Sequence, residues 1–565
     1  MSHHLRRTRL ALGALLCCVA LMAGACASLP EAGAPQPFDV SVPDAGPVDL
    51  AAGGPTKGSS PEELISDFLL ASAAGSTDDF ATARLYLTSQ EAGRWRPDAQ
   101  VEVYPTQTAP NLSVTTGTQG SADVSLDVPA VASIDDAGLL TRTEDSSSVS
   151  RQFHLVQESG EWRIDSLDDG IVLSQASFAA SYRLANLYFP STTGDVLVAD
   201  PRWYPAKRLA THLLTGLVAG PRASLAGAVT TAVPEGTTIP SQGMEISDHV
   251  AKVALSATLP SDQSTEQLLA WQVVETLTQA DTVSSVELTV SGTVVPTDAL
   301  PSSPTYRLDS AVGVTKDGLS LLTGSTLHKA LGSDVVGPAP VQPAIGPVNS
   351  SLLAWSAGDA VTVRDVDTGA TAKTTVASPT WPSIDRFGWT WSMSSGTTSA
   401  TPVALAASGA RVELKAPFSD SSTVAALRIA PDGARVLMLR VVGSTRSVWV
   451  APLQRTTDGT PKGLGVAIEV SGLSSGVLDA SWAGSQTLVA LRSDTTTPGG
   501  DLEVAVVPLG GFVTTLSAPT GAQVLSAGGS ASDILVGTSR GGALARSGSV
   551  WQAVGAEVSD LHYPG

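Results

Sequence analysis

Two short strings in the C-terminal half match the Gly-x-Ser-x-Gly pattern that surrounds the nucleophile of many hydrolases. They are GLSSG at residues 472–476 and GTSRG at residues 537–541. In such enzymes the serine lies on a tight turn between a strand and a helix. Neither string is followed by helical periodicity, and a chain with 53 glycines contains such strings by chance. We therefore interpret Ser474 and Ser539 as turn residues and expect no catalytic residue there.

Adjacent carboxylates occur at two places and could be read as acid/base pairs. They are Asp135 with Asp136, and Asp168 with Asp169. Neighbours along a strand point to opposite faces of a sheet, so two adjacent carboxylates do not converge on one substrate atom. Both pairs lie in predicted turns, where such side chains are usually solvated. We predict no catalytic role for either pair.

The seven histidines are too scattered to form a metal site of known spacing. His154 falls in a predicted strand and His212 in a predicted helix, and both are interpreted as hydrogen-bonded structural residues. The sequence contains no His-x-x-His, no His-Glu-x-x-His and no cysteine cluster. It therefore predicts no metal and no cofactor, and we expect a protein that is not an enzyme. The histidines stand at positions 3, 4, 154, 212, 249, 328 and 562.

The N-terminal segment has the features of an export signal. Three arginines precede an apolar run over residues 10–23, and small residues then lead to Cys26. This order is typical of a secretory signal peptide. The residues before Cys26 resemble a bacterial lipobox, so we predict a signal peptide over 1–25 and lipidation of Cys26. The alternative is an uncleaved anchor helix, but the run is shorter than the ~20 apolar residues that a membrane span needs.

Charge and cysteine content narrow the expected partners and compartment. The chain carries a net charge of −20, and removing 1–25 takes away three arginines and no acid. A protein this acidic is not expected to bind nucleic acid, which requires basic patches. Cys26 is the one cysteine left after cleavage, so the folded part must be held together without disulfides. We expect the protein at the cell membrane, anchored by lipid on the extracytoplasmic face.

A tether and a first α+β domain follow Cys26. Residues 26–59 are rich in Pro and Gly and predict a flexible linker. At Ser60 a capping box with Glu63 predicts the start of a helix, and a second helix is predicted over 77–87. Alternating strands then end in a hairpin over 153–164, turning at residues 159–160. The string GEWRID at residues 160–165 resembles the closing strands of cone-shaped domains related to nuclear transport factor 2, and we place this domain at 60–178.

The middle segment, residues 184–298, predicts a second α+β domain. Strands are predicted at residues 187–189, 196–199, 252–256 and 286–290. One helix is predicted to start at Pro205 and to stop at Gly220, and another to start with a capping box of Ser264 and Gln267. The order and strings of these elements resemble the GerMN domain of bacterial sporulation and germination proteins.

Beyond Pro301 helical periodicity disappears, which indicates an all-β region over 310–565. Two units begin alike, VGVTKDG at 312–318 and LRIAPDG at 427–433, and each places an Asp-Gly turn between two apolar strands. A third strand is predicted over 447–453. Seven of the eleven tryptophans lie between Trp355 and Trp551, as expected for packing between neighbouring sheets. At ~40–45 residues per blade the region predicts a β-propeller of about six blades. A pair of β-sandwiches is the alternative.

The whole order of segments is similar to that of the actinobacterial LpqB lipoprotein family. The GerMN strings carry most of this resemblance and the propeller region least. The resemblance implies a lipoprotein that contacts the extracytoplasmic domain of an MtrB-like sensor histidine kinase and modulates two-component signalling in cell-wall homeostasis and division. The alternative is a binder of cell-wall glycan or peptidoglycan that stacks propeller tryptophans on sugars. A hydrolase is the third and least supported class.

Overall fold

The computed structural model describes most of the chain after the predicted tether. The predicted signal peptide over 1–25, Cys26 and most of the tether over 26–59 lie outside the described residues. None of the helices in the described part is long and apolar enough to cross a membrane. The described residues are 53–117, 120–143, 147–493, 501–539, 542–554 and 558–565.

The first domain opens with the predicted capped helix. Helix α2 (Pro61–Ala74) begins after Ser60, whose Oγ accepts a hydrogen bond from the Glu63 amide at 3.3 Å. The Ser60 amide donates to Glu63 Oε2 at 2.8 Å, so the predicted capping box is confirmed. Ile65 and Phe68 are buried and place the apolar face of α2 in the core.

The predicted second helix over 77–87 is wrong in its extent. Asp79 and Phe80 adopt left-handed backbone angles, with φ of 56° and 61°, which interrupt any helix that passes through them. What remains is a 3-10 turn (Gly75–Thr77) and two short helices. These helices are α3 (Ala81–Arg84) and α4 (Ser89–Arg94).

Two four-stranded sheets pack with these helices around one core. One sheet has the strand order β2-β3-β6-β7 and the other β5-β4-β1-β8. The predicted hairpin is confirmed, with Ser159 and Gly160 at its turn at φ of 55° and 84°. Burial alternates along β3 as the sequence pattern predicts. The strands are β1 (Gln100–Tyr104), β2 (Asn111–Thr116), β3 (Ser121–Pro129), β4 (Ala132–Asp135), β5 (Leu140–Arg142), β6 (Ser148–Glu158), β7 (Glu161–Leu167) and β8 (Ile171–Ser174).

Helix α5 (Gln175–Ser181) leads into the middle domain, whose first two strands form a long hairpin. Strand β9 (Tyr182–Pro190) pairs antiparallel with β10 (Leu197–Pro205) along its full length. The predicted helix start at Pro205 is wrong, because Pro205 is still paired with Tyr182. Helix α6 (Leu209–Ala219) begins after Arg208, and Gly220 ends it with φ of 93° as predicted.

The second helix of this domain is also capped differently from the prediction. Helix α7 (Gln263–Leu277) is capped by Asp262, whose Oδ1 accepts the Thr265 amide at 2.8 Å. Ser264 therefore lies inside the first turn, and the expected Ser264 and Gln267 capping box is wrong. Helix α7 packs against a sheet of order β11-β12-β13-β14, in which β12 and β13 are parallel, and α6 packs against α7 and the β9–β10 hairpin. Its strands are β11 (Met244–Ser247), β12 (Val250–Leu255), β13 (Ser285–Val290) and β14 (Thr293–Val295).

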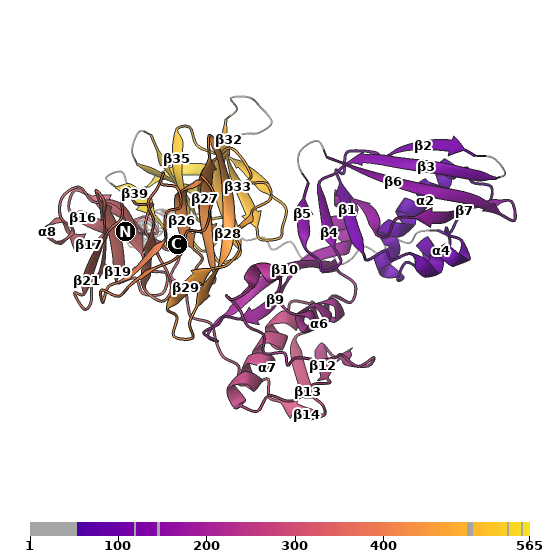
Figure 1. Cartoon of the computed structure of the whole chain (residues 1–565), viewed down its shortest axis with the longest axis horizontal. Coiled ribbons are helices and arrows are strands. Elements are labelled where there is room, and N and C mark those ends of the chain that lie inside the picture. The colour runs from indigo at the N-terminus through magenta and orange to yellow at the C-terminus, as the bar shows by residue number, and fades with distance from the viewer. Residues whose placement is uncertain (1–52, 118–119, 144–146, 494–500, 540–541, 555–557) are drawn as a thin grey trace, which may run out of the picture. The chain divides into compact units, whose positions relative to one another are not determined.

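The described residues after 309 form six small antiparallel sheets (Figure 1). Strand–turn–strand units occur where the two similar strings predict them, at β15 with β16 and at β26 with β27. The last strand, β39 (Ser559–His562), pairs with the first, β15 (Ser310–Thr315), so the region's two ends share one sheet. A short helix, α8 (Ser333–Val336), follows β17.

The strands of the six sheets are given in chain order. The first sheet holds β15, β16 (Gly318–Thr323), β17 (Thr326–Gly332) and β39, and the second β18 (Val341–Ile345), β19 (Leu352–Ala357), β20 (Ala360–Asp365) and β21 (Thr371–Thr375). The third holds β22 (Ser383–Ile384), β23 (Trp389–Ser392), β24 (Val403–Ala406) and β25 (Arg411–Glu413). The fourth holds β26 (Thr423–Ile429), β27 (Arg435–Val442), β28 (Thr445–Arg455), β29 (Pro461–Leu464) and β30 (Ile468–Glu469). The fifth holds β31 (Val477–Ala483), β32 (Thr487–Ser493), β33 (Leu502–Pro508) and β34 (Thr514–Ser517), and the sixth β35 (Ala522–Ala527), β36 (Ile534–Thr538), β37 (Ala543–Ser547) and β38 (Val550–Val554).

Buried serines join the first strand of one sheet to the next sheet. Ser383 accepts the Ile429 amide at 2.9 Å. Ser526 accepts the Tyr563 amide at 2.8 Å, and Ser481 is 3.4 Å from the amide nitrogen of Ala527. These bonds satisfy backbone donors that would otherwise be buried without a partner.

Candidate functional site

The two serines of the hydrolase-like strings do not lie on nucleophile elbows. Ser474 is exposed in the loop before β31, so a strand and not a helix follows it. Ser539 is exposed after β36, and its amide donates to the Gly521 carbonyl at 2.9 Å. Residues 540–541 of the second string lie outside the described residues.

In each carboxylate pair, one side chain is held by neighbouring residues through hydrogen bonds or a salt bridge. Asp135 Oδ1 accepts the amides of Ala137 at 3.0 Å and Leu139 at 2.8 Å, which closes the turn after β4. Asp169 forms a salt bridge with Arg96 at 2.8 Å. Hydrogen bonds from the Arg96 backbone and side chain hold the pKa of Asp169 below its usual range.

Neither singled-out histidine joins a cluster of ligands. His154 lies on β6 with Nδ1 2.7 Å from Asp123, and both side chains are exposed. The His212 ring stacks on Tyr204 with the ring centroids 5.9 Å apart. Burial, and next the charge of Arg208, lower the pKa of His212. Within the described ranges no three His, Cys, Asp or Glu side chains are grouped so as to hold a metal ion.

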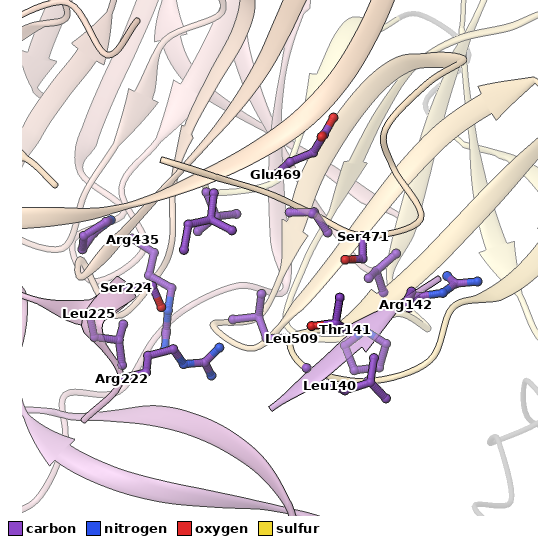
Figure 2. A pocket seen from close by; sticks show the side chains of 18 residues that line it. Leu140, Thr141, Arg142, Arg222, Ser224, Leu225, Arg435, Glu469, Ser471 and Leu509 are labelled. Carbon is purple, nitrogen blue, oxygen red and sulfur yellow. The ribbon is translucent and has the colours of Figure 1, made fainter. Parts of the chain in front are cut away.

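The cavity that stands out is lined by residues from all three folded segments, and we call it the joint cavity (Figure 2). Its volume is about 310 Å³. Three guanidinium side chains line it, Arg142 from β5, Arg222 from the loop after α6 and Arg435 from β27. The remaining wall is mostly apolar, together with three hydroxyls and one carboxylate. This wall includes Leu140, Thr141, Ser224, Leu225, Val450, Pro452, Ile468, Glu469, Val470, Ser471 and Leu509.

A buried carboxylate on β10 anchors the charged end of this cavity. Asp200 is fully buried and accepts Arg202 Nη2 at 2.8 Å. It also accepts the Arg222 backbone amide at 3.0 Å and the Arg222 Nε. One carboxylate therefore holds two guanidinium groups, from its own strand and from the loop after α6.

The charges of this cluster act on one another through a poorly hydrated interior. Burial alone would raise the pKa of Asp200, but the charges of Arg222 and Arg202 and their hydrogen bonds hold it below its usual range. Burial lowers the pKa of Arg222; Asp200 counteracts this, while the nearby positive charge of Arg435 adds to it. An arginine stays charged in a protein despite such a shift. The cluster is therefore a buried set of permanent charges.

The same strand bonds to the first domain. Arg202 Nη1 donates to the Ala137 carbonyl at 2.8 Å, and the Trp203 amide donates to the Gly138 carbonyl at 2.8 Å. Gly138 has φ of 78°, and a Cβ placed on it would lie 2.6 Å from the Trp203 carbonyl oxygen. The close approach of the two backbones therefore requires glycine at position 138.

The strand also bonds to the six sheets formed by the described residues after 309, which we call the six-sheet region. Trp203 Nε1 donates to the Gly510 carbonyl at 2.7 Å, and Arg435 Nη2 donates to the Ala199 carbonyl. The Trp203 ring packs against both Phe178 and Phe512, with centroid distances of 4.8 and 5.7 Å. Residues 199–203 of β10 thus contact all three domains, and we call this segment the joint strand.

A second contact lies at the far end of the β9–β10 hairpin. Arg386, which precedes β23, donates to both oxygens of Asp195 at 2.7 and 2.6 Å. Burial opposes ionisation of Asp195, but its hydrogen bonds to Arg386 and Thr193 bring the pKa down to about 2. The middle domain and the six-sheet region are therefore connected at two separate places, by hydrogen bonds to backbone carbonyls at the joint strand and by an ion pair at Asp195.

Sequence reasoning did not single out the joint strand. A signal was present, because Asp200, Arg202 and the flanking Pro201 interrupt an otherwise apolar stretch before Trp203. These charged residues follow directly on the strand predicted over 196–199, and charged residues are rarely buried unless they are paired. Their partners Arg222 and Arg435 are distant in sequence, and so the pairing could not be read from spacing.

Three family models match consecutive parts of the chain. "Lipoprotein LpqB, N-terminal domain" matches residues 54–179, "Sporulation and spore germination" matches 186–296, and "Lipoprotein LpqB beta-propeller domain" matches 317–564. Lipoprotein LpqB of Rhodococcus opacus is 26% identical over 539 residues, covering 87% of this chain and 86% of its own. The chain belongs to the LpqB lipoprotein family.

Other LpqB proteins show the same relationship. Lipoprotein LpqB of Mycobacterium leprae is 26% identical over 86% of both chains. That of Cutibacterium acnes is 33% identical over a shorter stretch, 44% of this chain and 41% of its own. The GerMN and propeller assignments of this LpqB family member therefore agree with the family models.

A likeness to solved structures is weaker. A calcium-binding protein, regucalcin, from Agrobacterium tumefaciens matches 46% of this chain and 91% of its own at 17% identity. The TM-score is 0.28, and a likeness of this size says nothing about the function of this LpqB family member.

Proposed function

We propose that the chain is a lipid-anchored accessory protein that binds the extracytoplasmic domain of an MtrB-like sensor histidine kinase. In this proposal it modulates two-component signalling in cell-wall homeostasis and division. The observation that carries the proposal is the joint strand, where hydrogen bonds from the Arg202 and Trp203 side chains to backbone carbonyls connect the middle domain to the other two. A fixed arrangement of three domains suits a protein that offers one composite surface to a partner.

The membrane attachment is supported by the family and by the N-terminal sequence. The relatives are named lipoproteins, and Cys26 follows small residues at the end of an apolar run. In our proposal lipid on Cys26 and the tether over 26–59 hold the folded domains at the extracytoplasmic face of the cell membrane. A lipid chain contributes about 0.8 kcal/mol per buried CH₂, so two or more chains would anchor the protein firmly.

The domain architecture in this proposal has a cone-like α+β domain at 60–178, a GerMN domain at 184–298 and a propeller at 310–565. We propose that each of the six sheets after residue 309 is one blade. The pairing of β39 with β15 supports this reading, because it closes the region on itself. Closure removes exposed sheet edges, which is how propellers avoid unwanted strand pairing.

We further propose that the protein is not an enzyme and carries no metal or cofactor. Ser474 is followed by a strand, and Asp135 and Asp169 are engaged by nearby residues. A nucleophile needs an adjacent base that is itself oriented by a third group. The described surroundings of these residues support a binding role over catalysis.

The glycan-binding alternative receives less support from the tryptophans. Four of the seven between 355 and 551 are buried, and a buried ring cannot stack on a sugar. Trp389, Trp449 and Trp551 are partly exposed, but the Trp449 ring already packs against Phe418 and lies beneath the Arg440 guanidinium. The buried four are Trp355, Trp381, Trp391 and Trp482.

A deletion strain tests the proposed function. Loss of the gene should change phosphorylation of the cognate response regulator, and the wild-type gene should restore it. A Cys26→Ala gene should fail to restore it and should abolish lipid labelling. Unchanged phosphorylation in the deletion strain would contradict the signalling role. Hydrolysis of wall material by purified protein, lost on Ser474→Ala or Ser539→Ala, would contradict the non-enzymatic role.

A further inference from the structure

We propose that the joint cavity binds a small amphipathic anion, with one phosphate or carboxylate head on a short apolar body. The head would lie beside Arg222 and Arg435, and the body along the apolar wall. This inference does not depend on the kinase as partner. It assigns a ligand site to a protein for which we propose no enzymatic activity.

The charges at one end of the cavity are not balanced. Asp200 pairs with both Arg202 and Arg222. Arg435 pairs with Asp432 at 3.0 Å. Three guanidinium groups thus face two carboxylates, which leaves one positive charge without a counterion in this cluster.

Among the described residues that line the cavity, none supplies the missing negative charge beside Arg222 and Arg435. Glu469 is the one carboxylate among the lining residues, and its side chain points away from Arg222 and Arg435 (Figure 2). Arg142 lines the opposite side of the cavity (Figure 2). An excess of positive charge at Arg202, Arg222 and Arg435 is notable in a chain with a net charge of −20.

Burial makes an unbalanced charge costly, so an anion would bind where the imbalance lies. The side chains of Arg435 and Arg202 are 4% and 6% exposed, and that of Arg222 is 22% exposed. The guanidinium group cannot lose its proton to relieve the cost. Its planar fork matches phosphate and carboxylate oxygens, and both kinds of hydrogen bond are charge-assisted.

The rest of the wall argues for an apolar body on the ligand. Leu140, Leu225 and Leu509 approach from the three different domains, and Thr141 and Ser471 add hydroxyls (Figure 2). A simple inorganic anion would leave this wall in water, and a neutral apolar molecule would leave the guanidinium charge unmatched. At about 310 Å³ the cavity is at the small end of ligand sites, which limits the body to a few carbons.

Because the lining comes from all three domains, such a ligand would bind the assembled joint more tightly than separated domains. A ligand that binds one arrangement stabilises that arrangement by mass action. We therefore expect the anion to make the joint more resistant to opening.

Calorimetry with the full lipidated chain in nanodiscs tests this site, with empty nanodiscs as the blank. The probes are hexyl phosphate and hexanoate. Two half-ligands serve as controls: hexanol, which has the apolar body without the anionic head, and inorganic phosphate, which has the head without the body. We expect saturable binding of at least one amphipathic probe, at least tenfold tighter than either half-ligand. Equal binding of hexanol or of inorganic phosphate, or no saturable binding of either amphipathic probe, would overturn the proposal.

Two matched substitutions show whether binding occurs in this cavity. Ser471→Trp fills the cavity while leaving every arginine in place, so it should abolish binding. Ser474→Trp puts the same side chain three residues further along the loop, outside the lining, and should bind as the wild type does. Arg222→Gln should weaken binding at least tenfold. Binding that survives Ser471→Trp would overturn the proposal even if Arg222→Gln fails to fold.

A last experiment distinguishes two sources of such an anion, a membrane lipid and a free amphiphile. Butanoyl lysophosphatidic acid presents a membrane-lipid head on one short chain, and hexyl phosphate presents a free alkyl phosphate. At least tenfold tighter binding of the former would assign the site to lipid, and the reverse order would assign it to a free amphiphile. Either order supports the site, and displacement of neither probe by the other would contradict a shared cavity.

Discussion

The joint strand and the six-sheet region both connect neighbouring units through side chains that bond to backbone, but they use different chemistry. At the joint strand, Arg202 and Trp203 reach backbone carbonyls of two other domains, and Asp200 pairs with two guanidinium groups of its own domain. Between the sheets, Ser383 and Ser526 accept one backbone amide each. The first connection concentrates charge in one segment, whereas the second repeats a neutral bond.

This difference predicts how each connection fails. A buried ion pair that loses one partner leaves an unbalanced charge in the interior, which is costly. A lost neutral hydrogen bond leaves only one unpaired amide, at much smaller cost. The domain arrangement should therefore depend on very few residues, while the six-sheet region should tolerate many single changes.

The largest effect is expected from Asp200→Asn. This change leaves Arg202 and Arg222 buried without a negative partner, and breaking a buried pair costs about 3–5 kcal/mol of stability. Urea unfolding followed by fluorescence measures the loss. Asp123→Asn removes an exposed partner of His154 and is the control, with an expected cost below about 1 kcal/mol. Equal losses in the two variants would contradict the central role of Asp200.

Acid should destabilise the six-sheet region through His562. Burial, and next the charge of Arg428, lower the pKa of His562 from 6.5 to about 3. In the unfolded chain the His562 ring therefore takes up a proton as the pH falls below 6.5, whereas in the folded chain the ring stays neutral. His562 contributes stability in full above pH 6.5, and the contribution is lost toward pH 3, at up to about 1.4 kcal/mol per pH unit.

Comparing His562→Phe with the wild type measures how much the protonation of His562 contributes to the pH dependence of stability. The free energy of unfolding of the variant should fall less steeply between pH 6.5 and 4. His328→Phe, at an exposed position, should keep the wild-type slope. An unchanged slope in His562→Phe would show that the buried ring does not resist protonation.

Gly138→Val should open the joint between the first domain and β10. The new side chain would meet the Trp203 carbonyl, and the left-handed angle adds about 1–2 kcal/mol for a residue with a Cβ. Limited proteolysis should cut between residues 130 and 205 faster than in the wild type. Gly160→Val has a similar φ of 84° with nothing within 4 Å of its Cβ, so it carries the strain without the clash. If both variants are cut alike, the close contact is not what holds the joint.

The smallest effect is expected from Ser383→Ala. It removes the acceptor of the buried Ile429 amide, which costs about 1 kcal/mol. Thermal unfolding measures this loss of stability, with Ser532→Ala, at an exposed serine, as the control. A loss as large as that of Asp200→Asn would remove the contrast between the two connections.

The regular parts of the fold were predictable because local patterns determine them. Ser60 with Glu63, the turn at residues 159–160 and the units at 312–318 and 427–433 each contain their own signal within a few residues. The errors at Pro205 and Ser264 share a cause, since another residue decided the outcome, whereas the helix predicted over 77–87 is interrupted by the left-handed angles of Asp79 and Phe80. Pro205 remains in a strand because Tyr182 pairs with it, and Asp262 caps α7 in place of Ser264.

The site was not predictable in the same way. Arg435 lies more than 200 residues from Ala199, whose carbonyl it reaches. Arg142 and Leu509 come to the same cavity from different domains. Such a site exists only after the domains pack, and a single sequence contains no local pattern for it.

The central claim is that three domains held as one body bind the sensor kinase, and biolayer interferometry tests it most directly. The lipidated chain in nanodiscs is titrated with the purified extracytoplasmic domain of the cognate kinase. We expect saturable binding that Gly138→Val weakens at least tenfold and Gly160→Val leaves unchanged. No saturable binding would contradict the proposed partner, and wild-type binding by Gly138→Val with a protease-sensitive joint would contradict the need for a fixed body.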